Sequence, residues 1–149
     1  MAVMGSTKFE RLFREAGQVR VDRDDVKRYL DFVNDVIYDM LLIGQATAKA
    51  NARDIIEPWD PPITAGLQQC MHQFGRIDED IELRPILDSL AARPPLASAL
   101  SEETQARLPL LFGGISVALA RTFHVLDAEL TAVHTDEWDR AFSVVRILI

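Results

Sequence analysis

The side chains that most often carry catalysis or bind metals are few in this chain and widely spaced. His124 and Asp127 stand three positions apart, so a metal ion could bridge them on one helical face, but no second pair of this kind completes a site. Cys70 and His72 would point to different sides of a helix, which argues against a nucleophile–base pair. His134 precedes two acidic residues, and helix capping explains those acids more simply than metal binding or pH sensing.

Sequence motifs for phosphate binding and hydrolysis are also absent. The chain contains no Walker A motif, no GxGxxG, no GxSxG and no HExxH. Cys70 is its single cysteine, which excludes an intrachain disulfide and a cysteine-based metal site. We therefore expect no catalytic residue, no metal and no cofactor, and hence a protein that is not an enzyme.

The elements that would position any site are helices. Apolar residues recur at helical spacing and nowhere alternate as in a strand, so the sequence predicts an all-α protein. Expected N-caps are Asp22 or Asp24, Asp60, Ser101 and Thr135, and Gly17 and Gly75 are expected to end helices. The predicted helices cover residues 8–16, 24–50 and 61–74, then 82–92, 101–130 and 135–149.

The order short, long, short therefore occurs twice. Both long helices are apolar on two faces, and two such helices cover one another by crossing, while the short helices cover the remaining faces. This is the handshake of two histone folds, here in one chain. An ordinary up-down helical bundle is the alternative, and periodicity alone does not separate the two.

The stretch KANARDIIEPWD resembles the second loop of archaeal histones, through Lys49, Ala52, Arg53, Ile56 and Asp60. RVDRDDV, residues 20–26, resembles the first loop of the same family. In that family the arginine and the aspartate form an ion pair, so the resemblance implies a clamp between Arg53 and Asp60. A plain surface pair next to a helix cap is the alternative.

Residues 8–149 as a whole resemble an uncharacterised bacterial family of single-chain double histone folds, in length, helix order and phrases such as FERLFREA and LRPILDSLAARPPL. The resemblance implies a histone pseudodimer with one shared core. Its halves would be residues 8–77 and 78–149, after a flexible N-terminus of residues 1–7.

The charge balance bears on nucleic-acid binding. The net charge is −7, and residues 1–77 hold ten basic against eleven acidic side chains, whereas residues 78–149 hold six against twelve. Asp54 and Glu57 replace lysines of archaeal histones, and the matching loop of the second half has no lysine or arginine. The candidate phosphate contacts are Lys8, Arg11, Arg14, Arg20 and Arg23, with Arg84 and Arg93 in the second half.

These observations favour a non-enzymatic interaction or assembly module that binds a protein partner or associates with itself. The alternative is a weak architectural DNA-binding protein. The start of the chain lacks the apolar core of a signal peptide, and no run approaches the roughly 18 apolar residues of a membrane span. We expect a cytoplasmic protein without a membrane contact, found at the nucleoid if it binds DNA.

Overall fold

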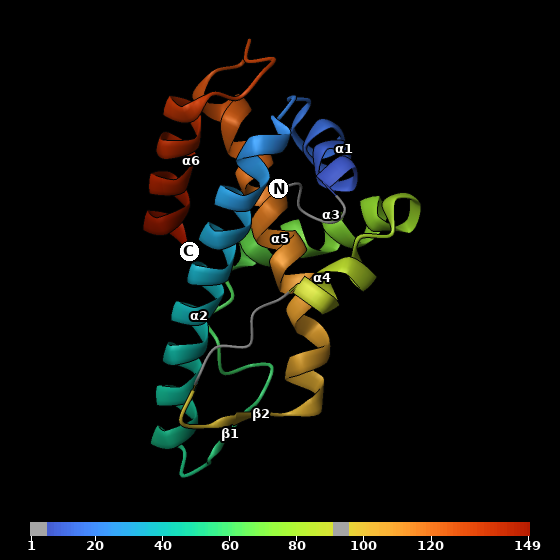
Figure 1. Ribbon diagram of the computed structural model, residues 1–149. Coiled ribbons are helices and arrows are strands. Elements are labelled where there is room, and N and C mark those ends of the chain that lie inside the picture. Colours follow the sequence, from blue (N-terminus) through green and yellow to red (C-terminus); the bar gives the residue numbers. More distant parts are fainter. Residues whose placement is uncertain (1–5, 91–95) are drawn as a thin grey trace.

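The computed structural model describes residues 6–90 and 96–149, and within them all side chains except those of residues 88–90. The prediction of a mostly helical protein is confirmed, with six α-helices in this part of the chain (Figure 1). No strand is expected from the sequence, yet two parallel strands of two residues each, β1 (Ile55–Ile56) and β2 (Ala99–Leu100), pair with Ile55 opposite Ala99. The strands are too short to show alternation, so sequence periodicity does not detect them.

The helices of the first half are α1 (Ser6–Gly17), α2 (Val26–Ala50) and α3 (Ala65–Ile81), with a 3-10 turn, η1 (Arg23–Asp25), before α2. Helix α1 begins inside the segment expected to be flexible, and residues 1–5 lie outside the described part. No side-chain hydrogen bond caps α2, although Asp22 or Asp24 is expected to do so.

Both ends of α3 differ from the prediction. Thr64 is its N-cap and accepts a 3.1 Å hydrogen bond from the Leu67 N–H, whereas Asp60 lies five residues before the helix. The helix continues past Gly75 to Ile81, because Ile81 is still buried against the core, and it ends at Glu82 in the left-handed conformation (φ 58°). The predicted cap and the predicted stop were therefore both wrong.

The helices of the second half are α4 (Arg84–Leu90), α5 (Glu102–Leu126) and α6 (Thr135–Leu148). Ser101 caps α5 as predicted, by accepting a 3.1 Å hydrogen bond from the Thr104 N–H. Helix α5 ends four residues before the predicted Leu130. Thr135 is the first residue of α6 and not its cap, and the preceding His134 makes no side-chain capping bond. The last two residues of the predicted helix 82–92 lie outside the described part.

Helices α2 and α5 are both 25 residues long, and α5 packs against α1, α2, α3, α4 and α6 (Figure 1). Short backbone pairings join the two halves at both ends of this arrangement. At one end β1 pairs with β2, and at the other the Arg20 N–H donates to the Thr131 carbonyl (2.8 Å) while the Val133 N–H donates to the Arg20 carbonyl (3.0 Å).

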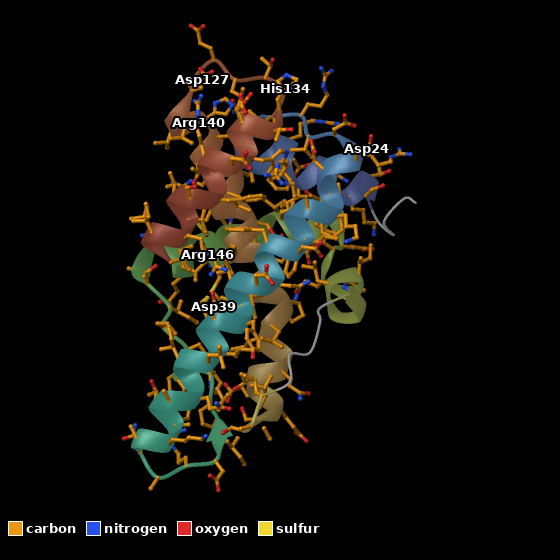
Figure 2. All side chains as sticks on the ribbon, turned by 60° about the vertical axis from the view of Figure 1, so that its left-hand side comes forward. Asp24, Asp39, Asp127, His134, Arg140 and Arg146 are labelled. Atoms are coloured by element: carbon orange, nitrogen blue, oxygen red, sulfur yellow. The ribbon has the colours of Figure 1, made fainter. Side chains whose placement is uncertain are left out.

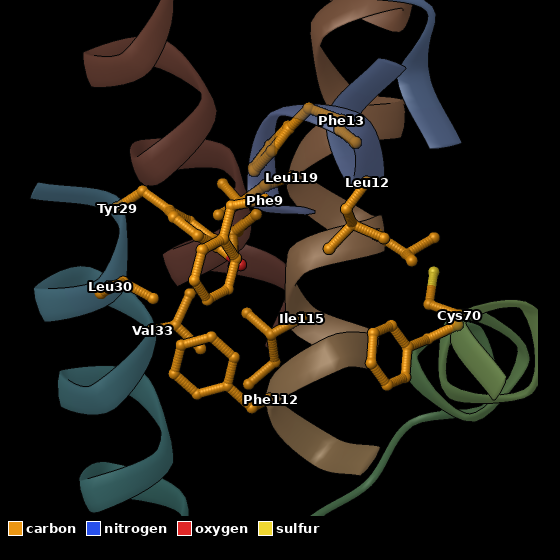
Figure 3. Packing of buried hydrophobic residues seen from close by; sticks show 14 of the residues in the cluster. Phe9, Leu12, Phe13, Tyr29, Leu30, Val33, Cys70, Phe112, Ile115 and Leu119 are labelled. Carbon is orange, nitrogen blue, oxygen red and sulfur yellow. The ribbon is translucent and has the colours of Figure 1, made fainter. Parts of the chain in front are cut away.

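A single hydrophobic cluster contains buried residues of all six helices. Figure 3 shows part of it, with labelled members from α1, α2, α3 and α5. Its centre is aromatic: the Phe13 and Tyr29 rings meet edge to face at 4.9 Å, and the Phe123 and Trp138 rings do so at 5.1 Å. The buried Tyr29 hydroxyl hydrogen-bonds the Ser116 hydroxyl, and burial raises the pKa of Tyr29. All-round packing of this kind fixes how the helices cross.

Helix α5 is long and apolar enough to span a membrane, whereas the sequence is expected to contain no such segment. No other helix in the described part of the chain meets this criterion. Its side chains are mostly buried between the other helices, as those of a core helix are.

Gly17 marks the closest approach of α1 to α5. A Cβ atom built at this position would lie 2.3 Å from the carbonyl oxygen of Ala120. The chain leaves α1 at Gln18, which takes the left-handed conformation (φ 53°). Helix α1 ends at Gly17, as the sequence predicts, but the left-handed residue is Gln18, so the close packing against α5 is what requires glycine at this position.

We predict that Gly17→Ala lowers the free energy of unfolding by about 1–3 kcal/mol, because the added methyl group overpacks against backbone that cannot rotate away. Gly66→Ala is the matched control, since a Cβ there meets nothing within 4 Å. In a helix it should raise stability by up to about 1 kcal/mol. Urea unfolding measures both, and a loss of the same size in both variants would contradict the close approach of α1 and α5.

Candidate functional site

Arg53 and Asp60 are joined by two parallel hydrogen bonds. Nη1 of Arg53 donates to Oδ2 of Asp60 and Nη2 donates to Oδ1, both at 2.7 Å. Arg53 Nη1 also lies 3.3 Å from the Ile55 carbonyl, and the Glu57 N–H donates to Asp60 Oδ2 at 2.8 Å. This contact, here called the Arg53–Asp60 clamp, closes the segment between α2 and α3 into a compact loop.

The carboxylate is the buried partner of the clamp. The Asp60 side chain is 0% exposed and that of Arg53 is 32% exposed. Hydrogen bonds from Arg53 lower the pKa of Asp60, burial opposes this, and the Glu57 N–H adds to the lowering. The same hydrogen bonds raise the pKa of Arg53. The hydrogen bonds of Asp60 all lie within the loop, and the residue that caps α3 is Thr64.

The clamp holds β1 in place for its contact with the second half. The Ile56 carbonyl accepts hydrogen bonds from the Ser101 N–H (3.1 Å) and from the Thr104 hydroxyl (2.8 Å). Ser101 and Thr104 are also the capping pair of α5. The loop after one long helix and the start of the other are thus a single hydrogen-bonded unit. Sequence reasoning identified the Ser101 cap but not its link to Ile56.

A second cluster lies at the other end of the long helices, where the backbone of Arg20 pairs with the backbone of Ala132. Arg14, Arg20 and Arg23 line a surface hollow of about 500 Å³ there. Glu10, Asp22 and His134 also line it. Figure 2 shows His134 and Asp24 at this end of the molecule. We call this cluster the arginine hollow. It can attract an anion, although its two carboxylates offset part of the charge.

The other predicted phosphate contacts do not join the arginine hollow. Lys8 donates a 3.2 Å hydrogen bond to the Glu82 carbonyl, and Arg11 forms an ion pair with Glu15 at 3.0 Å. Arg84 is exposed on the first turn of α4. Arg93 lies outside the described residues.

The candidate chemical groups remain apart. Asp127 accepts a hydrogen bond from the Glu129 N–H. The Nε2 atom of His124 is buried, and it forms no hydrogen bond with any residue in the described part of the chain. Cys70 is buried, with Arg121 Nη1 at 3.9 Å from its sulfur. Within residues 6–90 and 96–149, no three histidine, cysteine or carboxylate side chains are grouped as metal ligands would be.

Two interhelical ion pairs are not evident from the sequence. Arg28 of α2 contacts Asp139 of α6. Arg146 of α6 contacts Asp39 of α2 at 2.5 Å, and Figure 2 labels this second pair. Between them Phe32 and Phe142 stack, with ring centroids 4.1 Å apart. These residues are about a hundred positions apart in sequence, so no local pattern connects them.

Comparison with known proteins gives a family without a known role. The family model described as "Domain of unknown function (DUF1931)" matches residues 9–146. An uncharacterised protein of Aquifex aeolicus (strain VF5) is 22% identical over 111 residues, which are 74% of this chain and 65% of that protein. The match thus spans less than two thirds of the relative's length.

Two solved structures are similar to this fold. A crystal structure of a protein from Thermus thermophilus has 42% sequence identity and a TM-score of 0.87 over 97% of both chains. The crystal structure of protein AQ328 from Aquifex aeolicus has 19% identity and a TM-score of 0.83, covering 97% of this chain and 95% of that one. At that identity the second likeness concerns the fold alone.

We predict that Asp60→Asn lowers the free energy of unfolding at pH 7 by about 1–3 kcal/mol, the range for loss of a hydrogen-bonded charged partner. Because folding lowers the pKa of Asp60, its contribution is complete above the unfolded pKa of about 3.9 and is lost as the pH falls through the lower folded pKa. The difference between the two proteins should therefore shrink below about pH 4.

Denaturant unfolding between pH 3 and pH 7 measures this difference. Asp35→Asn is the matched control, because Asp35 is an exposed carboxylate on α2. It should change stability by less than about 0.5 kcal/mol. A gap between wild type and Asp60→Asn that is constant with pH would show that the charge of Asp60 does not stabilise the fold.

Proposed function

The chain belongs to the DUF1931 family, and on this premise we propose that it is a non-enzymatic histone-fold pseudodimer that acts as an interaction and assembly module. Residues 8–77 and 78–149 are its two halves, sharing one core. The protein acts in the cytoplasm.

The backbone pairings at the two ends support the arrangement. In each, the loop that follows one long helix pairs in parallel with the loop that precedes the other: β1 with β2, and Ala132 with Arg20. An up-down bundle of sequential helices has no need of such reciprocal pairing. Two histone folds related by an approximate twofold axis bring these loops together at both ends, and the two 25-residue helices fit the same plan.

Exposed apolar side chains support the proposed role in association. Ile147 is 81% exposed and Leu148 is 67% exposed at the end of α6. The contact of Arg146 with Asp39 holds this end of α6 beside α2, where Ile43, itself half exposed, lies one turn beyond Asp39. Grouped apolar residues on a protein surface mark sites of association. We call Ile43, Ile147 and Leu148 the α2–α6 apolar patch.

The arginine hollow favours a second candidate, weak binding of DNA. Arg14, Arg20 and Arg23 come together at one paired end, as phosphate contacts would require. The other paired end carries Asp54 and Glu57 and repels phosphate. DNA held at one end only would not be wrapped, and the protein would then act at the nucleoid as a minor architectural component.

We predict that the protein self-associates as its concentration rises, because burial of the α2–α6 apolar patch removes apolar surface from water. Ile147→Glu with Leu148→Glu should shift the dissociation constant of the dimer at least tenfold, measured by light scattering. Val125→Glu is the matched control, since Val125 is 84% exposed at the end of α5. A protein that stays monomeric at all concentrations and retains no partner in pull-down would contradict the module.

For the DNA alternative, we predict retention of duplex DNA at low salt and a slope of log affinity against log salt of about −3, from three contacts of about −0.9 each. Arg14→Glu, Arg20→Glu and Arg23→Glu together should abolish retention, whereas Arg84→Glu should leave it. A gel-shift titration between low and physiological salt measures this. Absence of any shift at low salt would exclude the DNA-binding candidate.

A further inference from the structure

Trp59 is the most unusual side chain on the surface of the clamp loop. It is 70% exposed, although tryptophan is seldom left in water, while the chain's other tryptophan, Trp138, is 1% exposed. No step of the fold described above needs this ring. Ile56, three residues earlier, is fully buried, so the loop is anchored without Trp59.

Trp59 lines a hollow whose walls are part apolar and part polar. The hollow has a volume of about 480 Å³. Its apolar lining includes Pro58, Pro61, Ile63 and Met71, and its polar lining is Asp60, Gln68, Glu103 and Arg107. A small adjoining cavity continues inward to Leu41, Leu108 and Leu111. The prolines and the Arg53–Asp60 clamp hold the loop in one shape, so a ligand would meet a preformed surface. We call this surface the Trp59 hollow.

The charge around the Trp59 hollow is negative. Arg53 is neutralised by Asp60, and Arg107 by Glu103 at 3.1 Å. Glu57 and Glu102 form no ion pair among the described residues. Glu57 and Glu102 do not line the hollow themselves, but they directly precede Pro58 and Glu103, which do. The net charge of −7 extends this field over the whole molecule.

We propose that the Trp59 hollow is the docking site for a cationic segment of a protein partner, which inserts an apolar side chain between the prolines and Met71. A lysine or arginine of the same segment lies over the Trp59 ring, whose π face attracts cations, and the neighbouring basic residues meet Glu57 and Glu102. The inference rests on the proposed interaction module and names the chemistry of one of its partners.

The chemistry of the site argues against the two nearest alternatives. Carboxylates at the rim repel the phosphates of a nucleic acid. A second copy of this chain is a poorer match than a basic segment, because it is acidic overall and offers the unpaired carboxylates near the hollow less opposite charge.

The probe is the synthetic peptide GKKLRKG, with GKKSRKG as the control for the apolar anchor and GEELEEG as the control for charge. Because Trp138 is buried, acrylamide quenching of tryptophan fluorescence reports on Trp59 in the intact protein. We expect GKKLRKG at saturation to reduce the quenching constant at least twofold. GEELEEG should leave it unchanged, and GKKSRKG should bind at least fivefold more weakly than GKKLRKG.

Anisotropy of the labelled peptide then locates the contact. Trp59→Ala should weaken binding at least fivefold, as should Glu57→Gln with Glu102→Gln, and Trp59→Phe should retain part of the affinity. Val125→Ala, at an exposed apolar residue on the end of α5, should change nothing. Equal unfolding midpoints would show that the variants are folded.

Absence of binding at millimolar GKKLRKG, or unchanged affinity in Trp59→Ala, would overturn the docking site. If either result were found while the protein still self-associates through the α2–α6 apolar patch, the proposed interaction module would remain supported. Peptide binding by a protein that remains monomeric at all concentrations would support the docking site and remove self-association from the proposed function.

Discussion

The burial of α5 is the constraint on which the rest of the structure depends. Residues 111–117 are buried without a break, two full turns with no face toward water. A helix of this kind must be enclosed by protein, and the other helices meet this requirement from all sides. Gly113 and Gly114 let α3 approach most closely, because a Cβ at either would collide with Phe74 or Met71. The position of every other helix follows from the need to cover this one.

The same constraint explains why the helix plan could be predicted from the sequence. Apolar residues on two faces identify the long helices, and Ser101 shows where the second one begins, because its cap depends only on neighbouring residues. The limits of α3 could not be predicted in this way. Asp60 has the composition and position of an N-cap, but Arg53 and the Glu57 N–H occupy its carboxylate, so that Thr64 caps the helix. A competing tertiary partner determines such a boundary, and local propensity does not contain it.

The candidate sites divide along the same line. Arg53 and Asp60 are seven positions apart, and their resemblance to a known loop was enough to suggest a contact. The arginine hollow depends on the pairing of Arg20 with Ala132, more than a hundred positions away, so the sequence indicates its arginines but not their meeting with His134. The exposure of Trp59 is likewise a property of the folded loop, since its neighbours Ile55 and Ile56 differ in burial although they are the same residue type.

The two paired ends both join loops in parallel, over two residue pairs at one end and a single bridge at the other, and their surfaces differ. Each end joins a loop of one half to a loop of the other, so the fold itself provides two comparable platforms. One presents three arginines with two carboxylates. At the other, the exposed Trp59 lines a hollow whose two carboxylates, Asp60 and Glu103, are paired with Arg53 and Arg107. A protein that wraps a polyanion needs positive charge at both platforms, because each contributes its own phosphate contacts. Positive charge is gathered at one end only, while at the other the Arg53–Asp60 clamp closes the loop around a paired carboxylate.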